Sequence, residues 1–172
     1  MKTRKIALLA LLTAIALTIF IIEAQIPLLV PIAGVKLGLA NVITLFTLVT
    51  LGRKEAFTVM ALRVILGSIF AGSVTSFMYS AAGALVCFVF MTVAAYILKN
   101  NMVWFISVIG AAGHNIGQII TAVILTKTVQ VIWYMPILMI SAVITGVFTG
   151  LLTQQLLKHG DGIIRKMIRE FK

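Results

Sequence analysis

The sequence predicts an all-α integral membrane protein, a bundle of six transmembrane helices. Hydrophobic residues make up 62% of the chain and charged residues only 10%, whereas about a quarter of a soluble domain is charged. Long apolar runs alternate with short basic segments, as in multi-pass membrane proteins. A net charge of +10 would also suit nucleic acid, but the basic residues fall between the apolar runs. We therefore expect the lipid bilayer, and no nucleic acid, around this chain.

The first half of the chain contains three predicted helices. Residues 6–22 are long enough to cross a bilayer, which takes about 20 apolar residues. A connection of residues 23–36 follows, and its two prolines disfavour a continuous helix. The second helix, 37–51, is short, so we expect it to lie among the other helices or in a thinned bilayer. The third covers residues 56–71.

The second half contains three further helices and a tail. A turn at Gly72 and Ser73 separates the third helix from the fourth, 74–98. The fifth covers residues 102–125, and the sixth covers 131–157 with Pro136 in its first turns. Residues 1–157 would thus form the transmembrane domain.

The remaining residues, 158–172, form a basic tail. Apolar and basic side chains alternate there with helical spacing, which suits a helix lying on an anionic membrane surface. A partly disordered, solvated tail is the alternative.

The distribution of basic residues predicts the orientation in the cell membrane. With the N-terminus inside, eleven basic residues lie in cytoplasmic segments, and only Lys36 and Lys127 lie outside. Such a bias is typical of cytoplasmic loops, so both termini are expected in the cytoplasm. Arg63 falls within the third helix. It would reach the cytoplasmic face, or pair with a carbonyl or with Glu55, and a substrate role is the less favoured reading.

A polar stretch interrupts the fifth helix. His114 and Gln118 share one helix face, and Asn115 lies one turn from Gln118. Polar side chains at this depth either pair with another helix or line a cavity. We expect them to form one wall of a substrate-binding site, with interhelical hydrogen bonding as the alternative. Gly113 and Gly117 would let a neighbouring helix approach closely.

Three other residues complete the predicted site. Lys36 and Asn41 stand at the outer entrance to the second helix, whose N-terminus favours an anion. Tyr79 lies near the outer end of the fourth helix, where it would either stack on a flat ligand or anchor the chain at the membrane surface.

Small residues at intervals of four predict close helix packing. Ala10 and Ala14 would give the first helix a flat face against which another helix packs, and ordinary packing within the bundle is the alternative. For Ala142, Gly146 and Gly150 on the sixth helix we expect packing within the bundle.

The titratable residues exclude several kinds of chemistry. The four carboxylates, Glu23, Glu55, Asp161 and Glu170, are not central in any helix, which disfavours Mg²⁺-diphosphate chemistry and a carrier built on buried acids. The single Cys87 and the two histidines give no metal site. No phosphate-binding GxxxxGK[ST] loop is present. We expect no catalytic residue, no metal and no cofactor.

Three sequence blocks carry a resemblance to a known family. They are Gly34-Val-Lys-Leu-Gly-Leu-Ala-Asn41, Arg63-Val-Ile-Leu-Gly-Ser68 and Gly113-His-Asn-Ile-Gly-Gln118. With the size and the six-helix pattern, they resemble the substrate-binding S components of energy-coupling factor (ECF) vitamin transporters. Within that group the chain is most similar to the Gx transporter family, also labelled heptaprenyl diphosphate synthase component I.

The resemblance implies a binding subunit of an ECF-type importer rather than an enzyme. The substrate would be a small vitamin, or a cofactor or isoprenoid precursor. Residues 25–36 would cap the site, and Ala10 and Ala14 would dock on a transmembrane coupling subunit driven by two ATPase subunits. The alternative is a non-transporting membrane protein that binds a quinone or isoprenoid, or scaffolds a redox assembly. A prenyl-chain synthase is disfavoured because its acid-rich motifs are missing.

Overall fold

The computed structural model describes residues 2–23, 25, 38–99 and 101–160, and this part of the chain is helical without any strand. The elements are α1 (Lys2–Glu23), α2 (Asn41–Thr50), α3 (Arg53–Ala71), α4 (Val74–Leu98), α5 (Val103–Thr126), the 3₁₀ helix η1 (Val129–Tyr134) and α6 (Met135–His159). The predicted all-α bundle of six helices is confirmed. The connection 26–37 and the tail from residue 161 lie outside the described residues.

Four helical segments are long and apolar enough to cross a membrane: α1, α4, α5 and the run from η1 through α6. The ten residues of α2 span about 15 Å, half of an apolar core of about 30 Å. The second predicted helix is therefore shorter than expected and cannot cross the bilayer alone. It contacts α1, α3, α4 and α6, so it lies among the other helices, which is one of the two predicted placements.

The turns follow from local residues. Gly72 adopts a left-handed conformation with φ of 60°, and the Ser73 side chain accepts a hydrogen bond from the Ser76 amide. This confirms the predicted turn between α3 and α4. Pro136 lies in the first turn of α6, where its missing amide costs no helical hydrogen bond. The sixth helix therefore begins at Met135, and η1 precedes it.

Glycines hold α4, α5 and α6 close together. A Cβ atom on Gly117 of α5 would come within 2.6 Å of the Ala82 carbonyl oxygen on α4, and one on Gly150 of α6 within 2.4 Å of the Trp104 Cα atom on α5. Backbones that approach so closely leave no room for a side chain. The predicted packing role of Gly117, and of Gly146 and Gly150, is confirmed.

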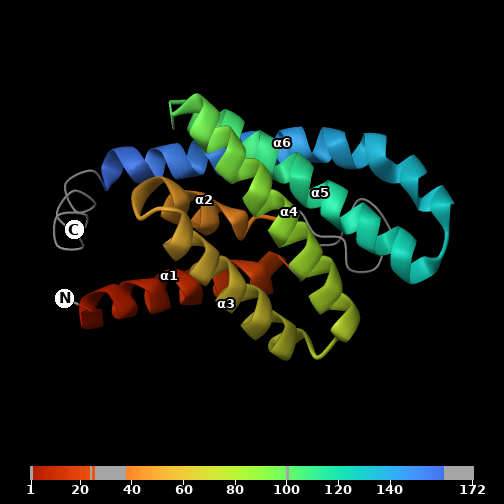
Figure 1. Cartoon of the computed structure of the whole chain (residues 1–172), viewed down its shortest axis with the longest axis horizontal. Helices are drawn as coiled ribbons and strands as arrows, with labels where there is room; N and C mark the ends of the chain where they lie inside the picture. Colours follow the sequence, from red (N-terminus) through yellow and green to blue (C-terminus); the bar gives the residue numbers. More distant parts are fainter. Residues whose placement is uncertain (1, 24, 26–37, 100, 161–172) are drawn as a thin grey trace.

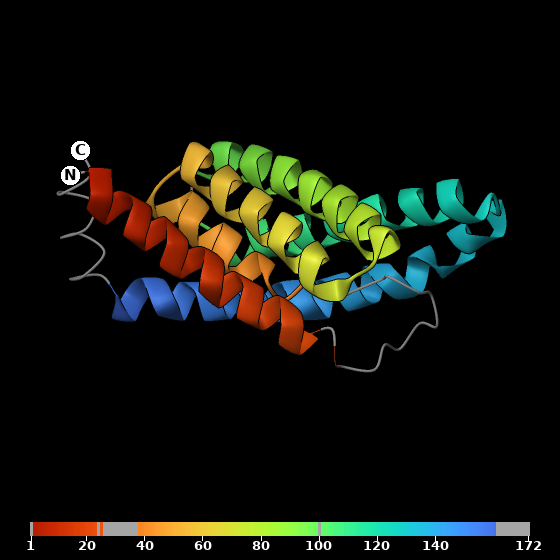
Figure 2. The ribbon, with the colours of Figure 1, turned by 90° about the horizontal axis from the view of Figure 1, so that it is seen from below.

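The basic helix ends gather at one end of the bundle. The start of α1, the α2–α3 connection, the end of α4 and the end of α6 lie there, and the η1 turn lies at the opposite end (Figures 1 and 2). Arg4, Arg53, Lys99 and Lys158 are exposed at the basic end.

An ion pair joins two helices at this basic end. The Lys5 ammonium donates to the Glu55 carboxylate, so the start of α1 is attached to the first turn of α3. The hydrogen bond from Lys5 is the largest cause that lowers the pKa of Glu55 below its ordinary value. Lys5 is substantially exposed, so competition from water limits the contribution of this pair.

Glu55→Gln should lower the stability of the protein by about 0.2–1 kcal/mol at neutral pH. A lowered pKa stabilises the fold above the unfolded-state pKa, and this stabilisation is lost as the pH falls through the folded-state pKa. The difference in melting temperature between E55Q and the unsubstituted protein should therefore disappear in acid. Lys99→Gln, also at the basic end, is the control. A difference that is independent of pH would show that packing, not charge, is lost.

Candidate functional site

The end of α1 is joined to the start of α2 by a buried carboxylate. Glu23 is only 3% exposed, and its two oxygens accept hydrogen bonds from the backbone amides of Gly38 and, at 3.4 Å, Ala40. A buried carboxylate needs such donors to offset its lost hydration. Glu23 therefore fixes the segment from which Asn41 and α2 begin.

Gly38 brings two predicted site residues together. It has φ of +79°, a left-handed conformation that favours glycine. A Cβ atom there would lie 2.9 Å from the Asn41 Nδ2 atom and 3.2 Å from the His114 ring. The amide of Asn41 and the imidazole of His114 thus both lie beside Gly38, although 73 positions separate them in the sequence.

Arg63 lies inside the bundle. It is 3% exposed, and its Nη2 donates to the Asn41 Oδ1 atom at 3.1 Å. The Glu23 carboxylate attracts the guanidinium, which also lies over the Phe20 ring at 6.0 Å. Of the predicted alternatives, pairing with a carbonyl is confirmed, whereas extension to the surface and pairing with Glu55 are wrong because Arg63 is buried and Glu55 pairs with Lys5.

His114 and Gln118 lie on the face of α5 that contacts α4. A Cβ atom on Gly83 of α4 would be 2.8 Å from the His114 ring and 3.2 Å from Gln118 Cγ. His114 and Gln118 therefore share one face of α5, as predicted, and that face is buried. Gln118 is completely buried, and neither its amide oxygen nor its nitrogen has a hydrogen-bond partner in the described part of the chain.

An unsatisfied buried amide is costly, at about 1–3 kcal/mol. Gln118 has a donor and an acceptor to offer, so a ligand that reached it would satisfy both. We call Glu23, Asn41, Arg63, His114 and Gln118 the polar cluster.

Asn115 has a different partner from its neighbours. Its amide nitrogen donates to the Leu138 carbonyl oxygen on α6 at 2.6 Å. This contact is an interhelical hydrogen bond, which was the alternative role predicted from the sequence. It gives the Asn115 amide nitrogen a partner. A role for Asn115 in ligand binding stays a prediction.

The remaining predicted residues are not all at the polar cluster. Tyr79 is buried on α4, one turn before Gly83 on the same face. Lys36 lies outside the described residues. Ala10 and Ala14 are exposed on α1, so they are not packed against the described part of the chain.

Two members of the polar cluster were not among the predicted site residues. Glu23 follows an apolar run, and Arg63 interrupts one. Charged groups within apolar helices signal a function or a buried partner, but the signal does not identify the partner. Glu23 binds the backbone just before α2, and Arg63 binds Asn41 at the start of α2. These links form only when the chain is folded, so the sequence alone does not reveal them.

The arrangement suits hydrogen bonding to a polar ligand more than metal chemistry. Among the described residues, no three His, Cys, Asp or Glu side chains lie close enough to hold a metal ion. The cluster instead supplies a guanidinium, two amides and an imidazole. These groups recognise carbonyl, hydroxyl and anionic groups.

A double-mutant cycle should show that Arg63 and Asn41 act as a unit. Asn41→Leu leaves one donor of the buried Arg63 guanidinium without its acceptor, so it should destabilise the fold by about 1.5–3 kcal/mol, the range for a hydrogen bond to a charged group. Arg63→Met with Asn41→Leu should be less destabilising than the sum of both, with a coupling of about 0.5–3 kcal/mol. Denaturant unfolding in mild detergent measures these energies, and additive effects would contradict the coupling.

Comparison with known proteins matches most of the bundle to one family. Residues 12–156 match the family model described as heptaprenyl diphosphate synthase component I. No curated protein and no solved structure matches the chain. The matched region runs from the middle of α1 almost to the end of α6 and includes every member of the polar cluster. The chain therefore belongs to the heptaprenyl diphosphate synthase component I family.

Proposed function

We propose that this protein is the membrane-embedded substrate-binding subunit of an ECF-type importer. The observation that carries the proposal is Gln118, a completely buried amide with both polar atoms unpartnered among the described residues. Gln118 and His114 both lie beside Gly83, and His114 and Asn41 both lie beside Gly38. Buried polar groups inside an apolar bundle are expensive and typical of a binding site.

The substrate is a small neutral or anionic organic molecule, such as a vitamin or a precursor of a cofactor or isoprenoid. Arg63 is the buried cation of the polar cluster, and Asn41 holds its guanidinium in place. The acid in the cluster, Glu23, already accepts bonds from two backbone amides. A cationic substrate would therefore meet Arg63 without a free carboxylate to offset the repulsion.

Partner subunits are supported by two observations. The family description names one component of a synthase, which implies an assembly of several chains. Ala7, Ala10, Ala14 and Thr18 form an exposed, small-residue face on α1, against which another helix could pack closely. We infer docking there of a transmembrane coupling subunit, which two ATPase subunits drive.

The basic end of the bundle supports the proposed orientation. Because cytoplasmic segments are rich in Lys and Arg, we assign this end to the cytoplasm and the opposite end to the outside. Both termini are then cytoplasmic in a multi-pass protein of the cell membrane.

A second candidate is a non-transporting membrane protein that binds an isoprenoid or a quinone. The family description refers to a prenyl diphosphate, which favours an isoprenoid. We do not place the prenyl-transfer chemistry in this chain. Its two described carboxylates, Glu23 and Glu55, are engaged by backbone amides and by Lys5, whereas Mg²⁺-diphosphate chemistry needs carboxylates to hold the metal.

Gln118→Leu should separate ligand binding from folding. Leucine removes an unsatisfied buried amide, so stability should stay equal or rise, whereas ligand binding should weaken roughly tenfold or more because one or two hydrogen bonds are lost. Native mass spectrometry of gently purified protein measures the fraction that carries a small molecule. Ser107→Ala, which removes a buried hydrogen bond to Thr149 on α6, is the matched variant on the same helix. It is expected to lower stability by about 0.6–1.7 kcal/mol and to leave binding intact.

Equal ligand occupancy in the Gln118→Leu protein and the unsubstituted protein would contradict the site. A bound long isoprenoid or quinone, in place of a vitamin-sized molecule, would support the second candidate.

Replacing Ala10 and Ala14 together by leucine should abolish uptake in cells and leave ligand binding by the isolated protein unchanged. The two added side chains would hold a partner helix away from α1. Val89→Leu with Val93→Leu, an exposed pair with the same spacing on α4, is the control and should retain uptake. Loss of uptake in both double variants, or loss of binding in the alanine variant, would argue against a dedicated docking face.

A further inference from the structure

A pocket with a basic lining lies at the charged end of the bundle, where the start of α3 and the end of α4 lie side by side (Figures 1 and 2). Its volume is about 630 Å³, within the range of ligand sites, roughly 300–1,000 Å³. Leu48 at the end of α2, Arg53 at the start of α3, and Tyr96 and Lys99 at the end of α4 line it. The pocket contains no member of the polar cluster, so it is a separate feature of the molecule.

Two cations in this pocket have no carboxylate partner in the described part of the chain. Arg53 and Lys99 both line it and both are exposed. The two carboxylates of the described residues are engaged elsewhere, because Glu55 pairs with Lys5 and Glu23 accepts hydrogen bonds from backbone amides. The pocket therefore offers two positive charges to an anion from outside the chain.

The aromatic ring of Tyr96 orients one of these cations. The guanidinium carbon of Arg53 lies over the ring, 5.6 Å from its centroid. Attraction to the ring face holds a guanidinium in place and leaves N–H groups along its edge available. A guanidinium can donate two parallel hydrogen bonds to a phosphate, and a lysine adds a point charge.

The remaining lining residues suit a ligand at the membrane surface. Tyr96 and Ile97 are among the most exposed large side chains of α4, and tyrosine is typical of the level where the hydrocarbon meets the headgroups. Thr92 also lines the pocket, and its hydroxyl has no hydrogen-bond partner among the described residues. Hydrogen-bond donors and cations are thus combined with apolar side chains at headgroup depth.

We propose that this pocket binds a phosphate group through Arg53 and Lys99, and that an anionic phospholipid headgroup is its source. Basic pockets between membrane helices bind anionic headgroups, and the exposed apolar side chains beside the cations match the lipid that carries the phosphate. A soluble phosphate would supply the same chemistry without using these apolar side chains. The inference is independent of the proposed transport function, because it uses no residue of the polar cluster.

Native mass spectrometry tests the lipid source. The protein is released from vesicles that contain phosphatidylglycerol and phosphatidylcholine at equal mole fraction, and the ratio of the two retained lipids is measured. The unsubstituted protein should retain phosphatidylglycerol preferentially. Arg53→Gln and Lys99→Gln should each lower the ratio about fivefold, because each removes one cation from the headgroup.

Lys54→Gln is the matched control for Arg53→Gln. Lys54 is exposed beside Arg53 and carries the same charge at the same end of the bundle, but it does not line the pocket. The K54Q protein should keep the ratio of the unsubstituted protein. An equal fall of the ratio in K54Q and R53Q would overturn the pocket, because it would show attraction to the basic surface as a whole.

The melting temperature in detergent tests the soluble source. Inorganic phosphate is compared with chloride at equal ionic strength, in the unsubstituted, R53Q and K54Q proteins. A rise with phosphate that only R53Q abolishes, without any lipid preference, would support the phosphate site and overturn the lipid source. Equal retention of both lipids together with no effect of phosphate would overturn the site itself.

Discussion

The structure depends on how a bilayer-embedded bundle accommodates one buried guanidinium. Arg63 cannot remain charged in an apolar surrounding without partners, and those partners come from other helices. Asn41 at the start of α2 accepts its hydrogen bond, and Glu23 at the end of α1 supplies the opposite charge. The same carboxylate binds the backbone that leads into α2. The positions of three helices are therefore linked through a single charge.

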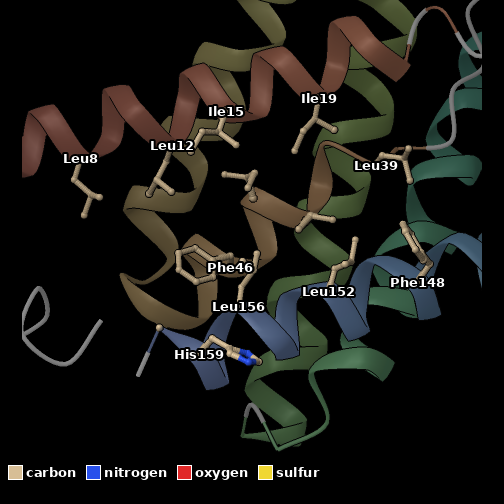
Figure 3. Close-up of a pocket in the computed structure, with 13 residues that line it drawn as sticks. Leu8, Leu12, Ile15, Ile19, Leu39, Phe46, Phe148, Leu152, Leu156 and His159 are labelled. Atoms are coloured by element: carbon tan, nitrogen blue, oxygen red, sulfur yellow. The ribbon is translucent and has the colours of Figure 1, made fainter. Parts of the chain in front are cut away.

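The short helix α2 separates two different environments. One of its faces carries Asn41 and Thr44 toward the interior, and the other presents Val42, Ile43 and Phe46 to an apolar groove between α1 and α6 (Figure 3). A helix of ten residues cannot stand alone in the bilayer, so its position is set by its neighbours.

Hydropathy and turn chemistry predicted most of the architecture. The bounds of α4 were predicted to the residue, because Gly72, Ser73 and Lys99 mark its ends, and the helical spacing of small residues predicted where α5 and α6 pack. The length of α2 was less accurate, since Leu37 to Ala40 are apolar like the helix itself. Within the site, helical periodicity placed His114 and Gln118 on one face. The link from Glu23 through Asn41 to Arg63 joins positions far apart in sequence, and such contacts cannot be inferred from local spacing.

The contact between Gly83 and His114 has an evolutionary consequence. The imidazole occupies the volume that a side chain at position 83 would need, so the two positions form one steric unit. An alanine at 83 would require a shift of the His114 ring, a smaller residue at 114, or a wider separation of α4 and α5, and in each case the site would differ. A histidine at 114 in its present position thus requires a residue without a side chain at position 83.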